Sequence, residues 1–231
     1  MFIKINSFVA NLLASFISIP AKHHLDIPFY SQWESPALVD KILSRKISAK
    51  DDPKWKNSGA KSKEEYEYWS WNLCGTACLK MIIAYENKKI PKLFTLARDI
   101  TRFGGYLPKN KKIIDGLFYK PFIQYLNEVH KRNAMIRNPL SLNRIKLELS
   151  KGNFPIVSVS QTIRDEQAPT PSNKTGHLVI ITGYDDSTNN LFLNNPSGYY
   201  RKSQKNHRIS YNDFLKFYSG RGIIVYGKKE N

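Results

Sequence analysis

The stretch NLCGTACLKMIIAY, residues 72–85, carries the strongest helical pattern in the chain. Its apolar side chains recur at i, i+1, i+4, i+5 and i+8, which places them on one face of a helix: Ala77, Cys78, Met81, Ile82 and Tyr85. We therefore predict a helix over 74–85 that packs against a core. Cys74 lies in its first turn, where backbone N–H groups and the helix dipole favour a thiolate. Cys78, one turn later on the buried face, lacks this advantage.

The composition around this helix is that of a folded globular protein. The 231 residues include 36 Lys and Arg against 19 Asp and Glu, which gives a formal net charge of +17. With 41% hydrophobic and 24% charged residues, a disordered basic tail, a collagen-like chain and a coiled coil are excluded. The length fits one large domain. The chain has only two cysteines, so a disulfide scaffold is also excluded.

The pattern places helices early in the chain and the sheet late, which predicts an α+β fold. Further helices are predicted over 93–100, 117–129, 141–149 and 211–218, and strands over 153–161, 177–184, 191–195 and 222–227. Residues 34–66 are polar and have no periodic apolar face. We interpret them mainly as a charged surface insertion with at most a short helix at 37–43.

The N-terminal residues 1–22 allow two interpretations. One Lys precedes an apolar run from Ser7 to Ile19, which is shorter than the roughly 20 residues that a membrane-spanning helix needs. The run fits a signal peptide, and it fits equally an amphipathic helix ended by Pro20. The first alternative implies an exported or secreted protein and the second a cytoplasmic one. In both, the folded domain covers about 25–228.

A predicted hairpin brings two polar residues together. If its turn is centred near Asp186, His177 at the start of one strand faces Asn195 at the end of the next. Paired side chains in an antiparallel sheet have Cβ atoms about 4.5–5.5 Å apart, so the amide oxygen could hold one imidazole nitrogen and fix the tautomer. The pairing depends on register, because a slip of one residue would put Asn194 in that place.

A Cys-Gly at a helix start, a His that opens an apolar strand and an Asn-Pro that closes the next strand occur here in that order. The chain resembles the papain-like cysteine peptidase family, in particular the double-glycine (bacteriocin leader) peptidases and their stand-alone relatives. The resemblance covers roughly residues 25–226, and the matching pieces are LDIPFYSQ, NLCGTACLKMI, LELSKGNFPIVSV, GHLVIITGYD and LNNPSG. It implies a papain-like fold, with an N-terminal helical part packed on a C-terminal antiparallel sheet and a groove between them.

The resemblance also implies roles for particular residues. It makes Cys74 the nucleophile, His177 the base and Asn195 the third member, a place where the family usually has Asp. An Asn cannot stabilise an imidazolium by charge. The family's oxyanion-stabilising Gln usually precedes the nucleophile by about six residues, where this chain has Tyr68. Gln32 is then the candidate, because the intervening insertion can loop out at modest entropic cost.

These roles imply hydrolysis of a peptide or related amide bond through a thioacyl-enzyme. An amine or thiol acceptor in place of water would make the protein an acyltransferase. The alternative is a catalytically weak or inactive papain-fold module that binds a peptide or an anionic surface. We expect no cofactor and no metal site, because the tandem His23-His24 lacks a second ligand pair at a metal-binding spacing.

The basic residues are scattered along the chain and do not form one block. They occur as KNKK at 109–112, KR at 131–132, RK at 201–202 and KK at 228–229. Such scattered charge usually forms a solvated surface, yet its field attracts anionic surfaces and polymers. The expected partners are thus a peptide or protein substrate and an anionic surface or polymer, without specific nucleic-acid binding. The oligomeric state stays open.

Overall fold

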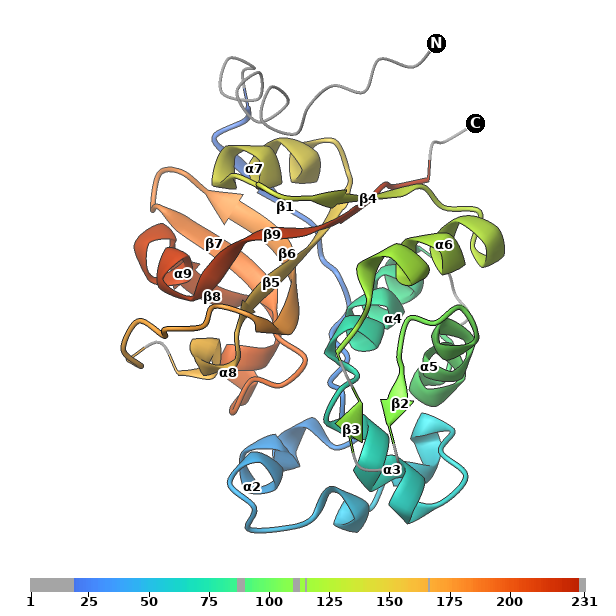
Figure 1. The fold of residues 1–231 in the computed structure, drawn as a ribbon. Helices are drawn as coiled ribbons and strands as arrows, with labels where there is room; N and C mark the ends of the chain where they lie inside the picture. Colours follow the sequence, from blue (N-terminus) through green and yellow to red (C-terminus); the bar gives the residue numbers. More distant parts are fainter. Residues whose placement is uncertain (1–18, 87–89, 110–112, 115, 166, 229–231) are drawn as a thin grey trace.

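The fold combines a cluster of helices with an antiparallel sheet (Figure 1). The computed structural model describes residues 19–86, 90–109, 113–114, 116–165 and 167–228. The run at 1–18, for which a signal peptide or an amphipathic helix is predicted, lies outside these described residues. Within them, every helix is too short or too polar to cross a lipid bilayer.

The centre of the sheet is built from the four strands that the sequence predicts late in the chain, whereas β1, β4 and β8 were not predicted. The strand order of the whole sheet is β4-β9-β5-β6-β7-β8, with β1 paired to the end of β6, and all of these pairs are antiparallel. The strands are β1 (Lys22–His24), β4 (Ala134–Arg137), β5 (Phe154–Ser160), β6 (Gly176–Asp185), β7 (Asn190–Asn194), β8 (His207–Ser210) and β9 (Tyr218–Val225). The strand β5 is buried along its whole length, as its apolar run predicts.

Most helices gather on one side of this sheet, and all of them except α3 match predicted ones (Figure 1). These are α3 (Lys63–Ser70), α4 (Cys74–Glu86), α5 (Leu93–Arg102) and α6 (Tyr119–Val129), together with the short α2 (Val39–Leu43). A small pair of strands, β2 (Pro108–Lys109) and β3 (Ile113–Ile114), lies among them. The helices α7 (Leu142–Ser150), α8 (Arg201–Gln204) and α9 (Tyr211–Phe217) accompany the sheet.

Serine residues fix where three of the longer helices begin. Ser62, Ser141 and Ser210 each accept a hydrogen bond from the backbone N–H three residues later, at the starts of α3, α7 and α9. Such N-caps satisfy donors that the first helical turn leaves without partners. At the other end of α7, Gly152 has φ +75, which is the left-handed conformation that ends a helix.

The segment 34–66 is more ordered than its sequence suggests. Besides α2 it contains three short 3₁₀ turns, η1 (Pro36–Leu38), η2 (Ala49–Asp51) and η3 (Trp55–Ser58). It exposes many charged residues, but it also buries four apolar side chains in the common core: Val39, Ile42, Ala49 and Tyr66. The segment is therefore folded against the helical part.

Asp52 holds this segment together. Its buried carboxylate accepts hydrogen bonds from the Ser35 backbone N–H at 3.0 Å, the Ser35 hydroxyl at 2.6 Å and the Tyr66 hydroxyl at 2.6 Å. Tyr66 in turn accepts from the backbone N–H of Glu34. This network has no hydrophobic periodicity, so the sequence pattern did not indicate it.

Replacing Asp52 with Ala should lower the free energy of unfolding by about 2 to 3 kcal/mol, because it leaves several buried donors without an acceptor. Denaturant unfolding of the full chain measures the effect. The matched control is Asp51→Ala, since Asp51 is exposed and accepts only a 3.2 Å bond from the Ser48 N–H. Equal effects of the two substitutions would contradict the role given to Asp52.

Candidate active site

The helix α4 begins at Cys74, in agreement with the sequence prediction. The thiol is partly buried and faces backbone N–H groups of Leu178, Gly75 and Cys74 itself. Burial raises the pKa of the Cys74 thiol above its ordinary value, and these N–H groups and the cation of Arg164 oppose that rise.

The crowded surroundings of Gly75 explain why the residue after Cys74 is a glycine. A Cβ at this position would lie 2.6 Å from Leu117 Cδ2 and 2.9 Å from Leu178 Cδ1. A side chain there would require the ends of the Leu117 and Leu178 side chains to shift, and Leu178 is the neighbour of His177 on β6. The missing side chain thus leaves room for Leu178 to pack against the helix that carries Cys74.

His177 and Asn195 are in contact, as predicted. His177 Nε2 lies 2.8 Å from Asn195 Oδ1, and both residues are buried. The backbone N–H of Ser197 donates to the same oxygen at 3.1 Å. A backbone N–H is always a donor, so this contact fixes which end of the amide is oxygen. His177 Nε2 must then carry the proton, and Nδ1 is the nitrogen left to act as a base.

The predicted register between β6 and β7 was wrong, although the contact holds. A turn centred at Asp186 would pair Ile181 with Leu191, but Ile181 pairs with Leu193, and the register shifts between Ile181 and Gly183. The turn occupies 186–189, so its centre lies beyond Asp186. Asn195 still reaches the imidazole because it follows the end of β7 in a turn, which the Gly198 N–H closes by donating to the Asn195 carbonyl at 3.1 Å.

Cys74 and His177 line one cavity of about 500 Å³ between the helical part and the sheet. The start of α6 contributes Leu117, Phe118 and Tyr119, and Arg221 on β9 lies at its exposed edge. The structure thereby brings together the predicted nucleophile and the predicted base in a mostly apolar space.

Gln32 lies close to this site despite its distance in sequence. Its backbone N–H donates to the carbonyl of Pro196 at 3.0 Å, and the Ser31 hydroxyl donates to the same carbonyl at 2.8 Å. The buried side chain donates one Nε2 hydrogen to the Ser70 carbonyl at 2.9 Å. An amide nitrogen has two hydrogens, so one remains for another acceptor. Tyr68, at the family's usual Gln position, lies on α3.

Two further residues complete the site, and sequence reasoning missed both. Ser197 Oγ lies 3.1 Å from His177 Nε2, and Arg164 Nε donates to the same oxygen at 2.9 Å. Ser197 belongs to the segment LNNPSG, two residues after Asn195, so its place in the sequence could have indicated that it lies at the site. Arg164 gives no such indication, because it lies in η4 (Gln161–Arg164), which follows β5 and has no motif of its own.

The environment keeps His177 neutral. Burial, and to a smaller extent the cation of Arg164, lower the pKa of His177 to about 3, although the hydrogen bond to Asn195 opposes the shift. Because burial also raises the pKa of Cys74, the resting pair at neutral pH is a thiol and an imidazole. This pair holds the one proton that general-base catalysis must move.

Cys78 is a core residue, as expected. It is fully buried, burial raises the pKa of its thiol well above the ordinary value, and its sulfur faces the Leu178 carbonyl at 3.8 Å. Among the described residues, no group of three or more His, Cys, Asp or Glu side chains has the arrangement of a metal site.

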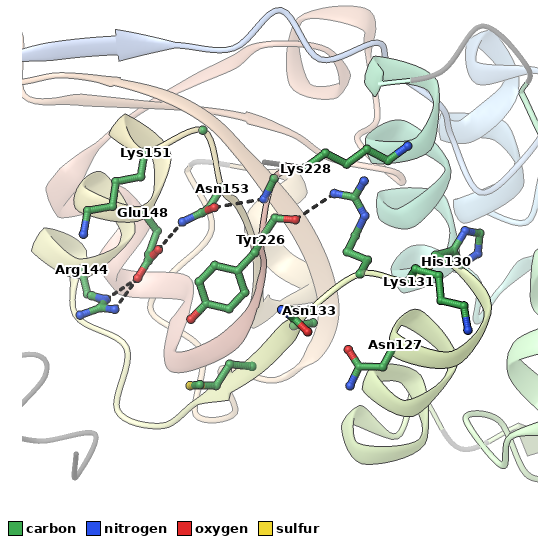
Figure 2. A pocket seen from close by; sticks show the side chains of 15 residues that line it. Asn127, His130, Lys131, Asn133, Arg144, Glu148, Lys151, Asn153, Tyr226 and Lys228 are labelled. Carbon is green, nitrogen blue, oxygen red and sulfur yellow. Dashed lines mark hydrogen bonds and ion pairs between the residues drawn. The ribbon is translucent and has the colours of Figure 1, made fainter. Parts of the chain in front are cut away.

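A larger cavity of about 1180 Å³ lies elsewhere, between α6, α7 and the ends of β4 and β9 (Figure 2). Arg144 and Asn153 both donate to the buried carboxylate of Glu148 there. Its described lining residues include no Cys, Ser or Thr, so it offers no nucleophile of these types. Lys131 and Lys151 at its rim are exposed, and the anionic partner expected from the net charge stays a prediction.

Comparisons with known proteins indicate the family and the fold of this chain. The sequence model of the Peptidase_C39 like family matches residues 24–223. A search of curated proteins finds no match.

Several solved structures are similar to this chain, including two at 15% sequence identity. A protein from Bacillus anthracis described as a C39-like peptidase aligns over 69% of this chain and 90% of its own, with a TM-score of 0.51. The peptidase domain of Streptococcus ComA, a bi-functional ABC transporter involved in a quorum-sensing pathway, aligns over 68% and 93%, with a TM-score of 0.43. The first likeness shows the papain-like fold that the sequence predicted.

The low pKa and the fixed tautomer of His177 can be measured directly. Long-range ¹⁵N–¹H NMR should show the Nε2–H form of neutral imidazole from pH 7 down to about pH 4. The folded-state pKa lies below the unfolded value of about 6.5, so His177 contributes stability that is present above pH 6.5 and is lost as the pH falls toward 3. A pKa near 6.5, or a proton on Nδ1, would contradict the geometry.

Proposed function

Because the chain belongs to the C39-like peptidase family, we propose that it is a cysteine peptidase that cleaves a peptide or related amide bond through a thioacyl-enzyme. One observation carries this proposal. Asn195 Oδ1 holds Nε2–H of His177, so the basic Nδ1 is available in the cavity that also contains Cys74.

The proposed reaction moves one proton between two residues. His177 Nδ1 takes the thiol proton while Cys74 Sγ attacks the carbonyl carbon. The tetrahedral intermediate collapses, the carbon–nitrogen bond breaks, and His177 returns the proton to the leaving amine. A water molecule then gives a proton to His177 and attacks the thioester, which releases the acid and restores the thiol.

The low pKa of His177 suits the step in which the amine leaves. An imidazolium that is unstable in its site is a strong acid, so it readily protonates the departing amine. Asn195 needs no charge for this role, because its task is to orient the ring and to fix the tautomer. An Asn in place of the family's usual Asp is thus compatible with catalysis.

The oxyanion would be stabilised by two N–H donors. One is the second Nε2 hydrogen of Gln32, and the other is the backbone N–H of Cys74 in the first turn of α4. The Gln32 backbone is anchored to Pro196, which directly follows Asn195. This anchor gives the donor a fixed position relative to the base.

Cys74→Ala should lower the rate of cleavage of an internally quenched peptide library by more than about 10⁴-fold, since the nucleophile is lost. The matched control is Cys78→Ala, which removes a buried thiol of the same helix and should keep most of the activity.

Iodoacetamide should modify Cys74 faster than Cys78 at pH 6. If wild-type protein cleaves no peptide and Cys74 reacts no faster than Cys78, the chain is a binding module of this fold.

Gln32→Ala should lower kcat by about 10²- to 10³-fold with little change in KM, because an oxyanion donor acts mainly in the transition state. Ser70→Ala is the control, since it leaves intact the backbone carbonyl that accepts from Gln32. Peptide hydrolysis assays measure both variants, and denaturant unfolding verifies that both fold. A similar small loss in the two variants would remove Gln32 from the oxyanion hole.

A further inference from the structure

Arg164 is a partly buried cation beside the candidate site. In the described ranges of the chain, no Asp or Glu forms an ion pair with it. Burial lowers the pKa of its guanidinium. Tyr199 and Cys74 oppose this shift, because their deprotonated forms are negatively charged. A charge that is partly removed from water without a partner is costly, so this position calls for a counter-charge.

Hydrogen bonds fix where this cation lies. Arg164 Nε donates to Ser197 Oγ at 2.9 Å, and the same oxygen lies 3.1 Å from His177 Nε2. Since Nε2 carries a proton that Asn195 accepts, Ser197 cannot donate to it. Ser197 also donates its backbone N–H to Asn195 Oδ1. One serine therefore joins the guanidinium to both members of the imidazole–amide pair.

The charge of Arg164 favours the charged form of Cys74 and disfavours the charged form of His177, because the first is an anion and the second a cation. A carboxylate in the place of Asn195 would do the reverse and favour the imidazolium. The imidazole of His177 thus contacts the neutral amide of Asn195, and the cation of Arg164 lies next to it, on the far side of Ser197.

We propose that Arg164, held by Ser197, is a positioning residue that stabilises the Cys74 thiolate by its charge and keeps His177 in its neutral form. This inference rests on the proposed function, because the thiolate is the nucleophile of that reaction. The thiolate that develops on Cys74 is then a negative group that the charge of Arg164 favours. The imidazolium formed in the same step is short-lived and passes its proton to the leaving amine.

Several other titratable or charged groups face the site, and among the residues that the structure describes none of these groups is a carboxylate. They come from the helical part, from β9 and from the loop after β7: Cys78, Tyr106, Tyr119, Arg221 and Tyr199. Burial raises the pKa of Tyr106 and of Tyr119, so both are neutral phenols at working pH. Arg164 is then the fixed charge that the hydrogen bonds of the site hold in place.

The test measures the pKa of Cys74 and that of His177 in the same variants. The pKa of Cys74 comes from the pH dependence of iodoacetamide alkylation, followed by mass spectrometry at that residue, and the pKa of His177 comes from ¹⁵N NMR. In Arg164→Gln both pKa values should rise, by about one unit, the lower end of what an adjacent charge produces. At pH 7.5 such a rise slows Cys74 alkylation about tenfold. Arg164→Lys should stay near wild type.

A merely structural role gives a different pattern. If the substitution only loosened the site, water entry would lower the raised pKa of Cys74 and raise that of His177, so the two would move in opposite directions. That pattern, or an unchanged Cys74 pKa in Arg164→Gln, would overturn the proposal. Ser197→Ala provides a second variant, in which both pKa values should also rise as the guanidinium loses its anchor.

The readout separates this inference from the proposed function. Alkylation of Cys74 needs no peptide substrate, so the effect of Arg164 is measured whether or not the protein cleaves peptides. A protein without peptidase activity whose two pKa values rise together in Arg164→Gln would refute the proposed function and keep the electrostatic role of Arg164.

Discussion

The site depends on one oxygen atom, Asn195 Oδ1, which accepts from the backbone N–H of Ser197 and from Nε2–H of His177. The backbone donor decides which end of the amide faces the imidazole, and the amide then decides which ring nitrogen carries the proton. A neutral hydrogen bond of this kind contributes only about 1 kcal/mol to stability. Its importance is chemical, because it leaves Nδ1 unprotonated, as the proposed role of His177 as a base requires.

The fold delivers this arrangement by tying together segments that are distant in sequence. The carbonyl of Pro196 accepts from Ser31 and Gln32, and the side chain of Gln32 reaches Ser70, just before α4. The extended segment after β1 thus joins the helical part that carries Cys74 to the loop that carries Asn195. Gly75 leaves room for the Leu178 side chain of β6 against α4, and both elements line the cavity.

Much of this could be predicted from the sequence, because α4, β5 and β6 have clear apolar periodicity and the Cys-Gly and Asn-Pro pairs mark their positions. The exact register could not, since it depends on a four-residue turn and on a shift within β6 that periodicity does not report. The order within 34–66 depends on the polar contacts of Asp52. Arg164 reaches the site only through tertiary structure, so its local sequence could not indicate it.

The central claim is that the sulfur of Cys74 and Nδ1 of His177 face each other, and bifunctional alkylation tests it most directly. The two reactive carbons of 1,3-dibromoacetone are separated by a single carbonyl carbon, so the reagent bridges only nucleophiles a few ångströms apart. The account predicts that peptide mapping after treatment near pH 7 finds Cys74 joined to His177 through Nδ1. A singly attached, hydrolysed reagent on Cys74, or a bridge to a different residue, would contradict it.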